Sequence, residues 1–189
     1  MAKKILFFAY PMYADFEIAH TLFFLRKVGN ATITTATVDG DPVESVAGLI
    51  TKAHAVISDV DPRDYDMVLV SGGDGIAKVV DDNRIREFLI SARMAGIPIA
   101  SICASAVLLG KAGLLAGKQF TCTPNTYEMF KAVFDAATYT GTRLEITDKM
   151  ITAKGTAFPE FTLAVLDTLA LWKNEEQRDY ALRFCKGEV

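Results

Sequence analysis

The chain has 189 residues, of which 51% are hydrophobic and 23% charged, a composition typical of a folded domain and not of a disordered chain. Its 20 basic and 23 acidic side chains give a net charge of −3, and no stretch gathers lysine and arginine into the basic surface that nucleic acid requires. We therefore expect one domain over residues 1–189, with no nucleic-acid partner.

The start of the chain predicts a buried strand and not a signal peptide, because the apolar run 5–9 is short and acidic residues soon follow it. No stretch approaches the roughly 20 apolar residues that cross a bilayer, so we expect no membrane partner. The cysteines Cys103, Cys122 and Cys185 are odd in number and lack CxxC spacing, which argues against a disulfide framework and a zinc site. A cytoplasmic protein without a metal is expected.

Apolar runs of strand length alternate with longer segments of helical period, the pattern of parallel strands joined by crossover helices. In chain order we expect strands at 4–9, 31–38, 66–70, 97–102, 119–121, 144–147 and 150–153, and a small hairpin within 42–51. We expect helices at 14–28, 82–95, 104–112, 125–134, 156–172 and 175–184. The order predicts a doubly wound α/β fold, with a mostly parallel sheet covered by helices on both faces.

Three segments are expected to meet at one edge of this sheet, because ligands of open parallel sheets gather at the carboxyl ends of the strands. The first is the loop after the first strand, which leads through Tyr13 to Glu17. The second is Gly72-Gly73, after the strand 66–70. The third is Cys103, which follows the strand 97–102 without a linker.

Cys103 stands between an apolar strand and a helix of small residues, as the nucleophile does in a strand-to-helix elbow. The N–H groups and dipole of the helix start favour a thiolate and predict a lowered cysteine pKa. Cys103 is thus a candidate nucleophile or oxidation sensor, and the alternative is a small buried core residue. We expect Cys122 and Cys185 to be structural.

Gly72 and Gly73 permit a close backbone approach, so their N–H groups could face an oxyanion formed by attack at Cys103, although such a pair also often makes a plain turn. Neither a phosphate loop nor a GxGxxG fingerprint is present, so no nucleotide cofactor is expected.

Glu17 lies in the first turn of a predicted helix, with Asp15 as the expected N-terminal cap, and this placement alone could explain it. If it faces Cys103 and is buried and protonated, it could instead hydrogen-bond the sulfur or move a proton. His20 and His54 are both poorly placed to serve as the base of a thiol hydrolase, so a Cys-His-acid triad is not expected.

Gly72-Gly73 after a buried strand, Ile102-Cys103-Ala104 at an elbow, Glu17 in the first helix and Gly155-Thr156-Ala157 before a late helix occur in consistent order. Together they resemble the ThiJ/PfpI, or DJ, superfamily, relatives of the class I glutamine amidotransferases. The resemblance covers nearly the whole chain. It implies a flavodoxin-like sheet and a homodimer.

The resemblance also implies roles for single residues. Cys103 matches the family's reactive cysteine and Glu17 its protonated partner, while Gly73 and Ala104 match the backbone oxyanion donors. The chain departs from the family where the protease-like branch has histidine after the cysteine and this chain has Ala104. It departs again where the DJ branch has histidine before a proline and this chain has Thr123.

A further departure is Ser105, where the family usually has glycine; its hydroxyl could add a polar contact or cap the helix. We name Ser105, Thr123 and Tyr13 as possible pocket residues beside Cys103 and Glu17. The leading hypothesis is a glyoxalase-like or deglycase-like enzyme acting on small carbonyl compounds or their adducts. The alternatives are a non-catalytic oxidative-stress sensor or chaperone that uses oxidation of Cys103, and a hydratase or amidase on another small substrate.

Overall fold

The computed structural model describes residues 2–189. Its central sheet has seven strands in the order β10-β11-β7-β6-β1-β2-β5. Their bounds are β1 (Lys4–Phe8), β2 (Thr32–Thr37), β5 (Ala55–Val56), β6 (Met67–Val70), β7 (Ile99–Ile102), β10 (Leu144–Thr147) and β11 (Met150–Ala153). Neighbouring strands pair in parallel except for β10 with β11.

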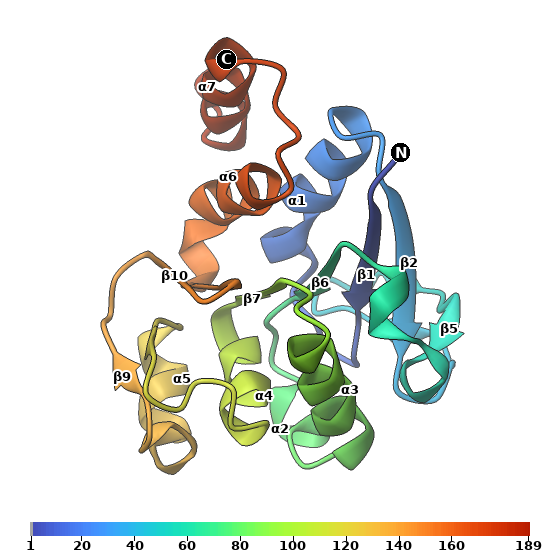
Figure 1. Ribbon diagram of the computed structural model, residues 1–189, viewed down its shortest axis with the longest axis vertical. Helices are drawn as coiled ribbons and strands as arrows, with labels where there is room; N and C mark the ends of the chain where they lie inside the picture. The colour runs from blue at the N-terminus through green and yellow to red at the C-terminus, as the bar shows by residue number, and fades with distance from the viewer. Residues whose placement is uncertain (1) are drawn as a thin grey trace.

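Helices cover both faces of this sheet (Figure 1). On one face lie α1 (Asp15–Lys27), α6 (Phe158–Thr168) and α7 (Glu175–Cys185). On the other lie α2 (Ile76–Val79), α3 (Asn83–Met94) and α4 (Ala106–Lys111). The predicted doubly wound, mostly parallel, flavodoxin-like α/β fold is confirmed.

Two small sheets flank the central one. The hairpin expected within residues 42–51 is present as β3 (Val43–Glu44) paired antiparallel with β4 (Ile50–Thr51). The weak strand expected near 119 is β8 (Gln119–Phe120), which pairs in parallel with β9 (Thr138–Tyr139). Next to this pair lies α5 (Pro124–Met129) (Figure 1).

The central strands are buried on both faces, which explains why they read as continuous apolar runs. Every residue of β6, β7 and β11 is buried, as is every residue of β1 after Lys4. In α1 the buried residues recur with the period of one helix face and include Glu17 among apolar neighbours. That helix face therefore brings a carboxyl group toward the sheet.

Some predicted boundaries were wrong. The strand expected at 97–102 begins at Ile99, and the helix expected at 104–112 begins as a 3-10 turn over Cys103–Ser105. The helix expected at 125–134 is split, because Phe130 leaves helical geometry between α5 and a second 3-10 turn. The helix expected at 156–172 ends near Ala170, whose positive φ of 52° stops α6. The short elements α2 and β9 were not predicted.

The strand order reverses at β1, which pairs with β2 on one side and with β6 on the other. Connections after neighbouring strands diverge at such a point and leave room for a ligand. β6 lies between β1 and β7, so the turn that carries Cys103 is separated from β1 by one strand. Within residues 2–189, helices long and apolar enough to cross a membrane do not occur.

A buried pair of hydroxyls joins α1 to α6, and it provides a test of how α1 is held. Thr21 and Thr162 are both fully buried, with their Oγ1 atoms 2.9 Å apart. Thr162→Val should lower the free energy of unfolding by about 1–3 kcal/mol, because it leaves the Thr21 hydroxyl without a partner. The double variant Thr21→Val/Thr162→Val should recover much of this loss in urea titrations. A double variant that loses as much stability as Thr162→Val alone, or as much as the two single variants together, would contradict the expectation.

Candidate active site

Cys103 sits on a sharp turn directly after β7. Its φ of 61° places a non-glycine residue in the left-handed region, which costs about 1–3 kcal/mol and is common at functional sites. The predicted elbow is therefore confirmed. Ala104 is buried and Cys103 is only partly buried, and both line a cavity.

Ser105 braces this elbow and does not line the cavity, so its assignment as a pocket residue was wrong. The residue is fully buried. Its Oγ lies 2.8 Å from the Ser101 Oγ, 2.8 Å from the Ile102 carbonyl oxygen and 3.0 Å from the Val70 carbonyl oxygen. These contacts tie the first turn after β7 to the ends of β7 and β6.

Glu17 reaches the elbow from the buried face of α1 and is only 3% exposed. Its Oε2 accepts a hydrogen bond of 3.0 Å from the Gly72 N–H. Because that N–H is occupied, the assignment of Gly72 to an oxyanion hole is wrong, and Gly72 instead positions the carboxyl group.

The expected helix cap, Asp15, is not the cap of α1, which is Ala14. The Asp15 carboxylate instead accepts hydrogen bonds from the Phe16 N–H and the Ser45 hydroxyl.

Two glycines leave the space in which Glu17 and Cys103 meet. A Cβ at Gly155 would lie 2.5 Å from Glu17 Oε1 and 3.1 Å from Cys103 Sγ. A Cβ at Gly72 would lie 2.5 Å from Cys103 Cβ and would also overlap Glu17 Oε2. Any larger residue at either position would displace the carboxyl group or the thiol.

The burial of Glu17 changes its acid strength. Burial raises the pKa of this carboxyl group to about 7, while hydrogen bonds with Cys103 and the Gly72 N–H lower it. The negative charge of Asp74 adds to the rise. Glu17 thus gains or loses its proton near neutral pH, in contact with the thiol.

Burial, together with the charge of Glu17, raises the pKa of the Cys103 thiol to about 12. Hydrogen bonds from the Thr123 hydroxyl and the Ala104 N–H lower it. The lowered pKa that we expected from a helix start is therefore wrong while Glu17 is ionised, since a three-residue 3-10 turn does not outweigh burial. Burial and the charge of Glu17 therefore both favour the neutral thiol.

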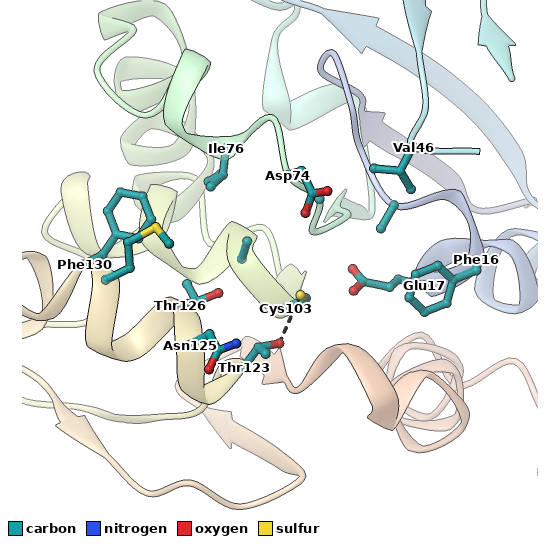
Figure 2. A pocket seen from close by; sticks show the side chains of 14 residues that line it. Phe16, Glu17, Val46, Asp74, Ile76, Cys103, Thr123, Asn125, Thr126 and Phe130 are labelled. Atoms are coloured by element: carbon teal, nitrogen blue, oxygen red, sulfur yellow. Dashed lines mark hydrogen bonds between the residues drawn. The ribbon is translucent and has the colours of Figure 1, made fainter. Parts of the chain in front are cut away.

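The cavity in front of the sulfur has a volume of about 500 Å³ (Figure 2). The Thr123 Oγ1 donates a hydrogen bond of 3.0 Å to the Cys103 Sγ, so Thr123 belongs to the site as expected.

Tyr13 does not line the cavity, and its assignment as a pocket residue was wrong. Its hydroxyl lies 2.7 Å from the Thr51 Oγ1 and its ring packs edge-on against Phe7.

Gly73 also lines the cavity, together with Ala104. Its φ of 138° and the backbone of Tyr13, whose Cα would lie 2.6 Å from an added Cβ, explain why glycine occupies this position. Gly73 pairs with Tyr13 in an isolated β-bridge, which fixes the loop after β6 against the loop after β1.

Neither histidine lines the cavity. His20 stacks on Phe158 with ring centroids 5.3 Å apart, and His54 Nδ1 accepts a hydrogen bond of 2.9 Å from the Thr35 N–H. Of the described part of the chain, no group of three His, Cys, Asp or Glu side chains could hold a metal ion.

Sequence reasoning missed most of the cavity wall. The further lining residues are Ala14, Phe16, Val46, Asp74, Ile76, Asn125, Thr126, Met129 and Phe130. Asp74 and Ile76 follow Gly72-Gly73 directly, so their position after a strand of the reversal was a usable signal. Val46 lies in the loop between β3 and β4, and the further lining residues after Ile76 lie on or directly after α5; the sequence pattern did not reveal how these peripheral elements pack.

The fold and the elbow define a flavodoxin-like α/β protein with a cysteine at a strand-to-helix turn beside the reversal of strand order. The DJ-1/PfpI family matches residues 3–168, and the chain belongs to this family.

The chain is similar to several named proteins. It is 28% identical over 172 residues to the uncharacterized protease YdeA of Bacillus subtilis, covering 88% of this chain and 83% of that one. It is 30% identical over 131 residues to the glutathione-independent glyoxalase DJR-1.2 of Caenorhabditis elegans, covering 68% of each. The crystal structure of the DJ-1 superfamily protein Atu0886 from Agrobacterium tumefaciens superposes with a TM-score of 0.87 at 26% identity, covering 98% of both chains.

The raised pKa of Glu17 makes folding depend on pH. The carboxyl group has a pKa of about 7 in the folded chain against an ordinary 4.5, so the folded state holds a proton that the unfolded state loses. The contribution of protonated Glu17 to the free energy of unfolding is complete below about pH 4.5 and is lost as the pH rises through 7. The loss amounts to about 3 kcal/mol.

Glu17→Gln removes this titration. We expect the free energy of unfolding of Glu17→Gln, relative to wild type, to rise between pH 5 and pH 8 in urea titrations. A difference that stays constant across this range would show that Glu17 titrates normally.

Proposed function

We propose that this chain is a cysteine-dependent enzyme acting on small carbonyl compounds or their adducts, with glyoxalase-like or deglycase-like chemistry. One observation carries the proposal. Glu17, a buried carboxyl group with a pKa raised to about 7, meets the Cys103 thiol at an elbow that opens on a cavity. A group that exchanges its proton near the working pH is suited to general acid–base catalysis.

The first step is attack on an aldehyde carbon. The Cys103 Sγ forms a bond to the carbon, the carbonyl π electrons move to oxygen, and the thiol proton passes through Glu17 to that oxygen. The product is a hemithioacetal, with no net gain or loss of protons. Glu17 serves because it can accept the proton as a carboxylate and return it as a carboxylic acid.

The second step applies to a 2-oxoaldehyde. The Glu17 carboxylate removes the hydrogen of the carbon bonded to sulfur and returns it to the neighbouring carbon, while the hydroxyl proton moves to the former ketone oxygen. This converts the hemithioacetal into a 2-hydroxy thioester without any external oxidant. Water then cleaves the C–S bond, which releases a 2-hydroxy acid and restores the thiol.

Backbone N–H groups of Gly73 and Ala104 are the proposed donors to the oxyanion. Both residues line the cavity beside the sulfur, and within residues 2–189 the Gly73 N–H makes no hydrogen bond. The Ala104 N–H already points toward Sγ, whose pKa it lowers. Neither donor has to break a secondary-structure bond to reach a substrate oxygen.

The lining of the cavity supports the carbonyl chemistry more than the peptidase chemistry. One relative is named a glyoxalase, and others are named proteases. A cysteine peptidase needs a group that takes the thiol proton and then, as its conjugate acid, gives a proton to the leaving amine. Among residues 2–189, Ala104 and Thr123 line the cavity at the positions where an imidazole could stand. Addition to a free aldehyde has no amine leaving group, so Glu17 alone suffices for that reaction.

The rival proposal, a redox sensor, ranks second. The Thr123 hydroxyl at 3.0 Å from Sγ and the Ala104 N–H could hold the oxygens of an oxidised sulfur. Peroxide reacts with the thiolate, however, and burial raises the pKa of this thiol. Mass spectrometry after mild peroxide tests the rival: selective addition of two oxygens to Cys103 supports it, and an unmodified Cys103 contradicts it.

Methylglyoxal turnover should rise with pH through a midpoint near 7. Below this midpoint both Glu17 and Cys103 are protonated and neither a base nor a thiolate exists; above it the pair has lost one proton and the first step can begin. Cys103→Ala should abolish turnover, and Glu17→Gln should lower kcat by about 10² or more and remove the pH dependence. Lactate formation measured from pH 5 to pH 9 checks this.

Cys185→Ser is the matched control, because Cys185 is a buried cysteine on α7 outside the cavity. Turnover in Cys185→Ser should match wild type. Unchanged turnover in Cys103→Ala would contradict the proposed function outright.

A further inference from the structure

The charge around the cavity is one-sided. Within the described chain, its fourteen lining residues include two carboxyl groups, Glu17 and Asp74, and no lysine, arginine or histidine. Small oxo acids are recognised in proteins mainly by such cations, and Arg in particular binds a carboxylate through two parallel hydrogen bonds. Nothing in this cavity offers that contact.

Asp74 is the exposed member of the pair. It follows Gly73 in the loop after β6 and lines the same cavity as Cys103 and Glu17 (Figure 2). Among residues 2–189 it forms neither a hydrogen bond nor an ion pair, so its charge is not neutralised by a neighbour. Its charge reaches the buried groups, since it raises the pKa of both Glu17 and Tyr10.

The remaining wall is apolar. Phe16, Val46, Ile76, Met129 and Phe130 line it, and Thr123, Asn125 and Thr126 give neutral hydrogen-bonding groups. Such a wall accommodates a short carbon chain and hydroxyl or carbonyl oxygens. None of these side chains carries a positive charge that would compensate a second negative charge placed beside Asp74.

We propose that Asp74 is a specificity-determining residue that excludes anions from the Cys103 cavity, so the substrate is an uncharged carbonyl compound and not an oxo acid. This inference rests on the proposed function for the word substrate, but the exclusion of anions concerns the cavity itself. A like charge a few ångström away across partly exposed solvent is worth about a fivefold difference in encounter with Cys103.

Alkylation of Cys103 tests the exclusion without any turnover. Iodoacetamide and iodoacetate have the same leaving group and nearly the same size, but only iodoacetate is an anion. Rates at Cys103 are measured by mass spectrometry for the folded chain and for a free peptide of residues 100–106. The ratio of the two rates cancels any change in thiolate fraction, which affects both reagents equally.

In wild type we expect the iodoacetamide-to-iodoacetate ratio to exceed that of the peptide by about fivefold or more. Asp74→Asn should bring the ratio toward the peptide value, and Asp74→Lys should lower it further. Asp179→Asn, which makes the same charge change at an exposed site on α7, should leave the ratio as in wild type. A wild-type ratio equal to that of the peptide, or one that Asp74→Asn does not move, would overturn the proposal.

The outcomes separate this proposal from the proposed function. A ratio that depends on Asp74 in a chain without methylglyoxal turnover would keep the anion exclusion and reject the carbonyl enzyme. Methylglyoxal turnover in a chain whose alkylation ratio does not change with Asp74→Asn would support the carbonyl enzyme and reject the anion exclusion.

Discussion

The site depends on one constraint: a carboxyl group and a thiol are buried against each other where neither has a full counter-charge. Glu17 is brought in by the buried face of α1, and Cys103 by the turn after β7. Since burial penalises both charged forms, the pair holds on to its protons more strongly than either group would in water. A proton that is shared near neutral pH is the property on which the proposed chemistry rests.

The rest of the local structure maintains that contact. Cys103 has a left-handed backbone, a conformation that persists only when surrounding contacts hold it. Ser105 supplies such contacts to the ends of β6 and β7, and Gly72 and Gly155 leave the room that the carboxyl group and the sulfur occupy. The Thr21–Thr162 pair joins α1, which carries Glu17, to α6.

The fold could be predicted from the sequence because its central strands are buried on both faces and its helices have one apolar face. Cys103 and Glu17 could be found because strand ends converge at one edge of such a sheet. Gly72 was misassigned because sequence pattern does not reveal which N–H group is already occupied. Ser105 and Tyr13 were misplaced for a related reason, since a hydroxyl beside a site can equally face the backbone behind it. The far wall around α5 depends on packing of short peripheral elements, for which periodicity gives no signal.

The central claim is that Glu17 keeps its proton far above the ordinary range of a glutamic acid. Infrared difference spectra of wild type minus Glu17→Gln, recorded across pH, isolate the C=O stretch of this one protonated carboxyl group. The band should persist at pH 6 and be half lost near pH 7, in line with the pKa of about 7 that burial produces. Loss of the band near the ordinary pKa of 4.5 would show a solvated, freely ionised carboxylate and would contradict the account.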